Sequence, residues 1–177
     1  KMKKILVGVD YQNDFVNGSL GFSKAVALEN RIYQKIEEYK RNGDEVVFTF
    51  DTHDENYLQT QEGKNLPVPH CIKNTQGWNL YGRISDLCDE TTRGFEKVTF
   101  GSLKLAEYLA ENKYDWVELV GVVSNICVIS NAVLAKAALP QAKVIVDASC
   151  TGSNDDSLNQ KSFDVMQGMQ IEVTNRG

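Results

Sequence analysis

Short runs of β-branched and other apolar residues alternate along the chain with longer stretches in which apolar residues recur at helical spacing. Each short run has a mostly apolar interior, which is typical of strands buried on both faces of a sheet. The expected strands are Ile5–Val9, Glu45–Phe50, Phe95–Val98, Val117–Val122, Val144–Val146 and Ile171–Val173. This alternation predicts an α/β fold of three layers, with helices on both faces of a mostly parallel, doubly wound sheet.

Four stretches of helical period lie between these strands. The first runs from about Ser23 to Arg41 and stops at Asn42-Gly43, a pair typical of a helix end. The others are Ser102 to about Asn112, Cys127 to just before Pro140, and about Asp155 to Gly168. The segment from about 51 to 89 has little periodicity and is too long for an ordinary connection, so we expect it to be a functional excursion.

Composition and charge narrow the class of protein. The chain has 177 residues, 42% of them hydrophobic, and a formal net charge of −5, so we expect one globular domain over residues 1–177. It has no basic run suited to nucleic acid or an anionic membrane, and no apolar stretch near the ~18 residues that span a bilayer. The four cysteines lack paired spacing. We therefore expect a cytoplasmic protein with free thiols and with neither nucleic acid nor membrane as a partner.

Reactive side chains gather where the expected strands end, the edge of an open α/β sheet at which ligands bind. Asp10 and Asp51 end the first two strands, Lys97 lies in the third, and Cys127 follows the fourth by a few residues. Any one acid here could equally be a helix cap or a turn former. Cys127 would start a helix, whose dipole favours a thiolate, although a buried cysteine is commonly inert. Because all four fall at one edge, we interpret them as an active site.

The only two histidines, His53 and His70, both lie in the excursion. Asp51 and His53 are two residues apart at a strand end, which places them on one face. One carboxylate and two imidazoles suit zinc, iron or manganese, although Asp and His also hydrogen-bond in ordinary loops. We predict one divalent metal ion, with zinc the preferred ion, bound by these residues.

Five motifs in collinear order resemble the isochorismatase-like cysteine hydrolases, and among them the nicotinamidase/pyrazinamidase branch. They are Val9-Asp10-Tyr11-Gln12-Asn13-Asp14-Phe15, Asp51-Thr52-His53, Pro69-His70-Cys71, Lys97, and the run from Gly121 to Val128. The resemblance implies a six-stranded sheet of order 3-2-1-4-5-6. It also implies a homo-oligomer, either a dimer or a tetramer.

The resemblance further implies roles for residues of this chain. Asp10, Lys97 and Cys127 match the catalytic triad, and a cis peptide at Val122–Val123 would direct the N–H groups of Val123 and Cys127 into an oxyanion hole. Asp51, His53 and His70 match the metal ligands, with Glu62 as a further acidic ligand. Phe15 and Phe100 match pocket aromatics, and Leu66 or Trp78 would supply the wall at which Pro67 replaces an aromatic residue.

The implied reaction is deamidation of nicotinamide to nicotinate and ammonia through a thioester on Cys127. Because Pro67 replaces an aromatic residue, it favours a second hypothesis, in which the same chemistry acts on another small amide or carbamoyl substrate. A third reading is a phospho-acceptor domain that uses Asp10, although it leaves Cys127 and both histidines unexplained. A fourth is a regulatory module that has kept the fold without the activity.

Overall fold

All six strands run parallel in one sheet of order β3-β2-β1-β4-β5-β6. The computed structural model describes residues 1–177. The strands are β1 (Lys4–Val9), β2 (Glu45–Asp51), β3 (Arg93–Lys97), β4 (Trp116–Val122), β5 (Lys143–Gly152) and β6 (Glu172–Thr174). The parallel sheet and the strand order expected from the sequence are confirmed.

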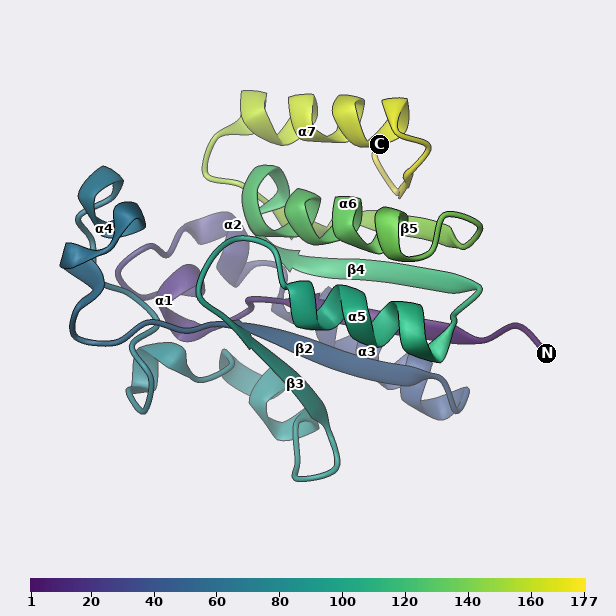
Figure 1. The fold of residues 1–177 in the computed structure, drawn as a ribbon, viewed down its shortest axis with the longest axis horizontal. Helices are drawn as coiled ribbons and strands as arrows, with labels where there is room; N and C mark the ends of the chain where they lie inside the picture. The colour runs from purple at the N-terminus through teal and green to yellow at the C-terminus, as the bar shows by residue number, and fades with distance from the viewer.

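Helices cover both faces of the sheet (Figure 1). One layer holds α5 (Leu103–Asn112), α6 (Ile129–Ala138) and α7 (Asp156–Gly168), and the other holds α1 (Asn13–Val16), α2 (Ser23–Val26) and α3 (Glu29–Arg41). In β1, Ile5 and Val7 belong to the apolar cluster under the first layer, whereas Leu6 belongs to the cluster under the second. Burial on both faces explains the almost continuous apolar runs of the strands. None of these helices is both long and apolar enough to cross a bilayer.

The expectation of one helix over 23–41 is wrong, because the chain forms two helices there. Between α2 and α3, both Ala27 and Leu28 have a ψ of −14°, shallower than in a regular α-helix. The N–H of Leu28 bonds to Ala25 O, three residues back rather than four. This tight turn redirects the chain while Ala25 and Leu28 both stay buried in one apolar cluster. The apolar spacing is therefore continuous although the helix is not.

β5 is ten residues long and extends far beyond the predicted strand at 144–146. Leu119 pairs with Val146 but Gly121 pairs with Thr151, so the register with β4 shifts within the strand. The added part begins at Asp147, a buried carboxylate 2.5 Å from the ammonium group of Lys35. Because polar and small residues form this part of the strand, hydrophobic periodicity does not reveal it.

The excursion between β2 and β3 consists of short turns and one short helix. These are η1 (Tyr57–Gln59), α4 (Gln61–Asn65), η2 (Gln76–Trp78) and η3 (Gly82–Leu87). α4 projects beyond the carboxyl end of β2, while the chain from η2 to η3 returns beneath β2 and β3 (Figure 1). The excursion therefore builds out the edge of the sheet at which the reactive side chains were expected.

Gly121 is required where β4 passes closest to β1. Its φ is +112°, and a Cβ there would lie 2.1 Å from Val9 O. We expect Gly121→Ala to lower the free energy of unfolding by about 3 kcal/mol, because the conformation is strained for any L side chain and the backbone of β1 cannot move away. Urea unfolding followed by circular dichroism measures the loss.

The matched control for this prediction is Gly168→Ala. Gly168 ends α7, and a Cβ there would meet nothing within 4 Å. We expect this variant to stay within about 1 kcal/mol of the wild type. Equal stability of the two variants would contradict the close-approach argument.

Candidate active site and metal centre

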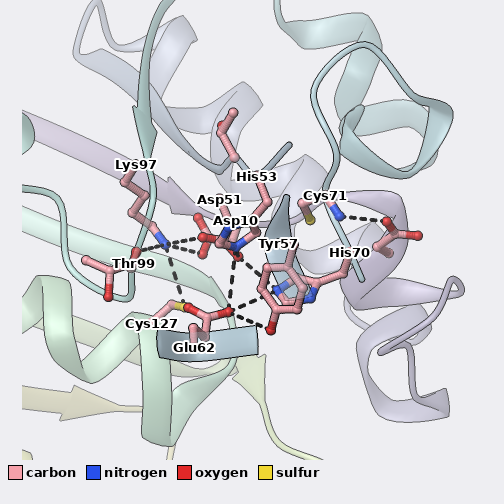
Figure 2. Close-up of polar contacts among 12 residues, drawn as sticks. Asp10, Asp51, His53, Tyr57, Glu62, His70, Cys71, Lys97, Thr99 and Cys127 are labelled. Atoms are coloured by element: carbon pink, nitrogen blue, oxygen red, sulfur yellow. Dashed lines mark hydrogen bonds and ion pairs between the residues drawn. The ribbon is translucent and has the colours of Figure 1, made fainter. Parts of the chain in front are cut away.

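The ammonium group of Lys97 lies at the centre of a buried polar cluster at the carboxyl ends of β1, β2 and β3 (Figure 2). Its Nζ is 2.6 Å from Asp10 Oδ2 and 3.7 Å from Cys127 Sγ. It is also 3.6 Å from Asp51 Oδ1 and donates a hydrogen bond to Thr99 O at 2.9 Å. The fold thus brings together the acid, the base and the thiol that the sequence placed at separate strand ends.

Asp10 is held in a specific conformation directly after β1. Its φ is +47°, in the left-handed region that Asp tolerates better than most residues. Its Oδ1 accepts a hydrogen bond of 2.7 Å from Thr49 Oγ1, and its N–H donates to the carbonyl and hydroxyl oxygens of Thr49. Complete burial raises the pKa of Asp10, an effect that Lys97 opposes. Oδ2 forms the ion pair with the Lys97 ammonium, and the Asp10 carboxylate is also close enough to the Cys127 thiol to raise the pKa of that thiol.

Cys127 lies within a π-helical turn, Ser124–Val128 (η4), rather than at the first residue of a helix as predicted. The N–H of Val128 bonds to Val123 O, five residues back, and α6 begins only at Ile129. Burial, followed by the charge of Asp10, raises the pKa of the thiol well above its usual value, and Lys97 only partly offsets this. The thiolate therefore needs a proton acceptor beside it.

The peptide bond between Val122 and Val123 is cis, as the family resemblance implied. It lies between the end of β4 and η4. The N–H groups of Val123 and Cys127 remain the predicted oxyanion donors. Val123 directly precedes the turn Ser124–Val128, and Cys127 lies within it, so both N–H groups belong to the segment that carries the sulfur.

Four side chains of the excursion and the end of β2 converge as a potential metal site: Asp51, His53, Glu62 and His70. Nε2 of His53 lies 3.0 Å from Asp51 Oδ2 and 3.6 Å from Glu62 Oε2. Nε2 of His70 lies 3.2 Å from the same Asp51 atom and 3.5 Å from the same Glu62 atom. A tetrahedral zinc ion with bonds near 2.05 Å separates its ligand atoms by roughly 3.3 Å, so these spacings fit a divalent ion.

The charges and tautomers of this cluster also fit a cation. Asp10, Asp51 and Glu62 carry three formal negative charges and Lys97 carries one positive charge. The net formal charge of these side chains is therefore −2, which a divalent ion would balance. His70 Nδ1 is 2.7 Å from Val68 O, so Nδ1 carries the proton and Nε2 presents its lone pair to the site. Burial alone would raise the pKa of Asp51, but its contacts with His53, His70 and Lys97 lower it, which keeps it a charged ligand.

Two residues that sequence reasoning missed support these ligands. Tyr57 is buried, its ring meets both imidazoles edge-on, and its hydroxyl lies 3.1 Å from Glu62 Oε2. Gln12 is fully buried, and its amide accepts from the N–H of Asp51 and donates to Asp51 O, each at 2.9 Å. Gln12 lies in a quoted motif, but nothing in the sequence says which backbone its amide will meet. The role of Tyr57 leaves no local signal at all.

The segment after β1 fastens the excursion in place. Asp14 Oδ2 accepts a hydrogen bond of 2.8 Å from the N–H of Cys71, which follows the predicted metal ligand His70. Asn13 donates to Gln76 O at 2.8 Å, and Ser19 donates to Pro69 O at 3.1 Å. The position of His70 therefore depends on hydrogen bonds between chain segments fifty or more residues apart.

A cavity of about 690 Å³ opens beside the potential metal site and is lined by His53, Glu62, Thr99, Leu66 and Phe100, among others. Leu66 and Phe100, two of the predicted pocket residues, both line this cavity. Phe15 is not part of the lining. It is buried and packs against His70, with the two ring centroids 5.3 Å apart. Neither Pro67 nor Trp78 lines the cavity, and Trp78 stacks on Phe50 instead.

Comparisons with known proteins agree with this geometry. The family model of the isochorismatase domain matches residues 4–176. An uncharacterized isochorismatase family protein of Bacillus subtilis is 35% identical over 143 residues, with 75% of this chain and 78% of that protein covered. The nicotinamidase of Saccharomyces cerevisiae is 27% identical over 216 residues, and the match covers 98% of this chain and 100% of that protein. The crystal structure of a pyrazinamidase/nicotinamidase from Streptococcus mutans has a TM-score of 0.87 at 30% identity, and the match covers 97% of this chain and 99% of that one.

The position of Glu62 predicts that it binds the metal ion. We expect Glu62→Gln to weaken zinc binding at least ~10-fold, because a neutral amide replaces a charged ligand atom that lies 3.5 to 3.6 Å from both imidazoles. Competition with a chromophoric chelator measures the affinity. Glu55→Gln, which neutralises an exposed acid of the same excursion, is the control and should bind zinc like the wild type. Unchanged affinity in Glu62→Gln would contradict the assignment.

The contacts of Lys97 predict the pH dependence of the thiol. Lys97 lowers the pKa of Cys127, so Lys97→Met should raise that pKa further and slow alkylation of Cys127 at pH 8 by roughly tenfold or more. The rate should recover as the pH rises, because the thiolate is the reactive form. Iodoacetamide labelling of the Cys127 peptide, followed by mass spectrometry across pH, measures this.

The control for the Lys97 variant is Lys73→Met, which removes a cation from the outer wall of the cavity. Its labelling profile should match that of the wild type. A wild-type profile in Lys97→Met would show that the ammonium does not act on the sulfur.

Proposed function

Because this chain belongs to the isochorismatase domain family, we propose that it is a cysteine amidohydrolase that deamidates nicotinamide to nicotinate and ammonia. One observation carries the proposal: the buried contact of Lys97 with both Asp10 and Cys127, beside a convergent set of four metal-binding side chains. The nicotinamidase of Saccharomyces cerevisiae and the pyrazinamidase/nicotinamidase of Streptococcus mutans support the choice of substrate, because each covers nearly the whole chain.

The first half of the reaction is transfer of the acyl group to sulfur. Asp10 takes the proton of Cys127, and the Lys97 ammonium stabilises the resulting thiolate. The thiolate attacks the amide carbon, while the N–H groups of Val123 and Cys127 hold the oxygen. The C–N bond breaks as Asp10 returns the proton to the departing ammonia, which leaves a thioester on Cys127.

The second half is hydrolysis of that thioester. A water molecule gives a proton to Asp10 and attacks the acyl carbon, and the acid leaves as the C–S bond breaks. Asp10 passes the proton to the sulfur, so Asp10 and Cys127 regain their starting states. The raised pKa of Asp10 suits this exchange, since a carboxyl that is too acidic would be a poor base.

The metal site serves to orient the substrate. Asp51, His53, His70 and Glu62 would hold a divalent ion, which we propose is zinc because two imidazoles and two carboxylates at these spacings suit it. When bound, the ion supplies a Lewis acid at the cavity wall for a lone pair such as a ring nitrogen. Phe100 and Leu66, which line the same cavity, offer the apolar surface that an aromatic ring requires.

Ammonia release from nicotinamide tests the proposal. We expect the zinc-loaded wild type to turn over nicotinamide, and Cys127→Ala to lose at least ~1,000-fold in kcat, because the nucleophile has no substitute. Cys88→Ala, which removes a free thiol outside the site, should retain full activity. A panel of other small amides and carbamoyl compounds is assayed in parallel. Good turnover of one of these without turnover of nicotinamide would replace the proposed substrate.

A further inference from the structure

Asn131 is a fully buried polar side chain to which the proposed reaction assigns no role. It lies in α6, one helical turn after the nucleophile. Its Nδ2 donates to Cys127 O at 2.8 Å and to Phe100 O at 3.2 Å, and its Oδ1 accepts the N–H of Ser102 at 2.9 Å. The side chain thus joins the turn that carries the nucleophile to the loop between β3 and α5.

The orientation of this amide follows from its neighbours. The two carbonyl oxygens can only accept and the N–H of Ser102 can only donate, so the NH₂ group must face the carbonyls. Both amide protons and the carbonyl oxygen are then used. A buried amide with all its partners in place holds those partners firmly, because breaking any one contact leaves a polar group unpaired.

The loop that Asn131 holds reaches over the cavity. Val98, Thr99 and Phe100 all line it, and Thr99 O accepts from the catalytic Lys97. The loop arches past the amino end of α6 before α5 begins (Figure 1). At Gly101 it approaches α6 so closely that a Cβ would lie 2.7 Å from Leu134 Cδ1.

The ring of Phe100 has little packing of its own. The residue is 46% exposed and belongs to neither apolar cluster, so its place over the cavity depends on its backbone. Its carbonyl is bonded to Asn131, which also bonds the carbonyl of the nucleophile. One side chain therefore sets the backbone of Phe100 relative to Cys127.

We propose that Asn131 is a positioning residue that fixes the ring of Phe100 at a set place relative to Cys127, so that an aromatic amide is presented to the sulfur. It acts through Phe100 and touches no reacting atom. The inference rests on the proposed function and deepens it, because it predicts a preference for ring-bearing amides and names the residue that maintains it.

A double-mutant cycle tests the coupling. In zinc-loaded protein, Asn131→Ala should raise the KM for nicotinamide about tenfold, the equivalent of one lost aromatic contact, and leave kcat within about threefold. In a Phe100→Ala background, the same substitution should change KM by less than about twofold. A purely structural role would lower the active fraction and kcat without this dependence on Phe100. Additive effects on KM, or an unchanged KM, would overturn the proposal.

Two further variants protect the test against misfolding. Asn131→Ser keeps a hydroxyl donor for Cys127 O, four residues back in the chain, and loses the longer amide that bonds Phe100 O, so it replaces Asn131→Ala if that variant does not fold, with the same expected shift in KM. Ser102→Ala is the matched control, because it removes only the cap that Ser102 Oγ provides to the Leu105 N–H. It should lower the Tm and leave KM unchanged. A raised KM in Ser102→Ala would show that any loosening of this loop raises KM, and this result would contradict a specific role for Asn131.

A measurement without turnover separates this proposal from the proposed function. Alkylation of Cys127 by iodoacetanilide, which carries a phenyl ring, is compared with alkylation by iodoacetamide, which has none. The wild type should favour the ring-bearing reagent, and Asn131→Ala and Phe100→Ala should lose that preference to the same extent. If both variants lose the preference but the wild type does not turn over nicotinamide, only the proposed substrate is rejected. If Asn131→Ala keeps the wild-type preference, the proposed role of Asn131 is rejected.

Discussion

The buried ammonium group of Lys97 is the interaction on which the rest of the site depends. A positive charge with only 3% of its side chain exposed is stable only if opposite charges surround it, and Asp10 and Asp51 provide them. Their positions follow from the sheet, in which Asp51 pairs with Lys97 across β2 and β3, and Asp10 follows directly after β1. The same cation lies 3.7 Å from the Cys127 sulfur, so the contact that satisfies the buried charge also prepares the thiol for chemistry.

Asp51 connects this charge cluster to the potential metal site. One carboxylate oxygen faces Lys97, and the other faces both His53 and His70. The amide of Gln12 bonds both the N–H and the carbonyl oxygen of Asp51, so the backbone of the residue that joins the two centres is itself held in place. An ion at the metal site and a proton at the triad therefore act on one another through a single carboxylate. The excess of negative charge around Lys97 fits a site completed by a divalent cation.

The two halves of the site differ in what supports them. Asp10 follows β1, whose apolar residues are buried on both faces of the sheet, and Lys97 ends the edge strand β3, in which Phe95 packs into the core. Cys127 and Val128, in the turn after β4, pack into the same apolar cluster as Phe95. His70 and Glu62 belong to an excursion with short turns in place of long helices, held by single hydrogen bonds from the segment after β1 and by the ring of Tyr57. Asp10, Lys97 and Cys127 are therefore held by the sheet and its core. Much of the cavity wall belongs to the excursion, in which substitutions can change the shape of the wall.

The sequence by itself determined the strands, the parallel three-layer architecture and the gathering of Asp10, Asp51, Lys97 and Cys127 at one edge, because burial on both faces leaves continuous apolar runs and parallel strands all end on the same side. The two histidines and Asp51 indicated a metal site, and the family motifs added the strand order and Glu62 as a further potential ligand. Only the tertiary structure decided the break between α2 and α3, the polar half of β5, the absence of Phe15 from the cavity lining and the roles of Gln12, Tyr57 and Asn131. Each of these depends on a partner distant in the chain, such as Asn131 meeting Phe100 and Ser102, and no local pattern of polar and apolar residues records which buried amide or hydroxyl will meet which backbone.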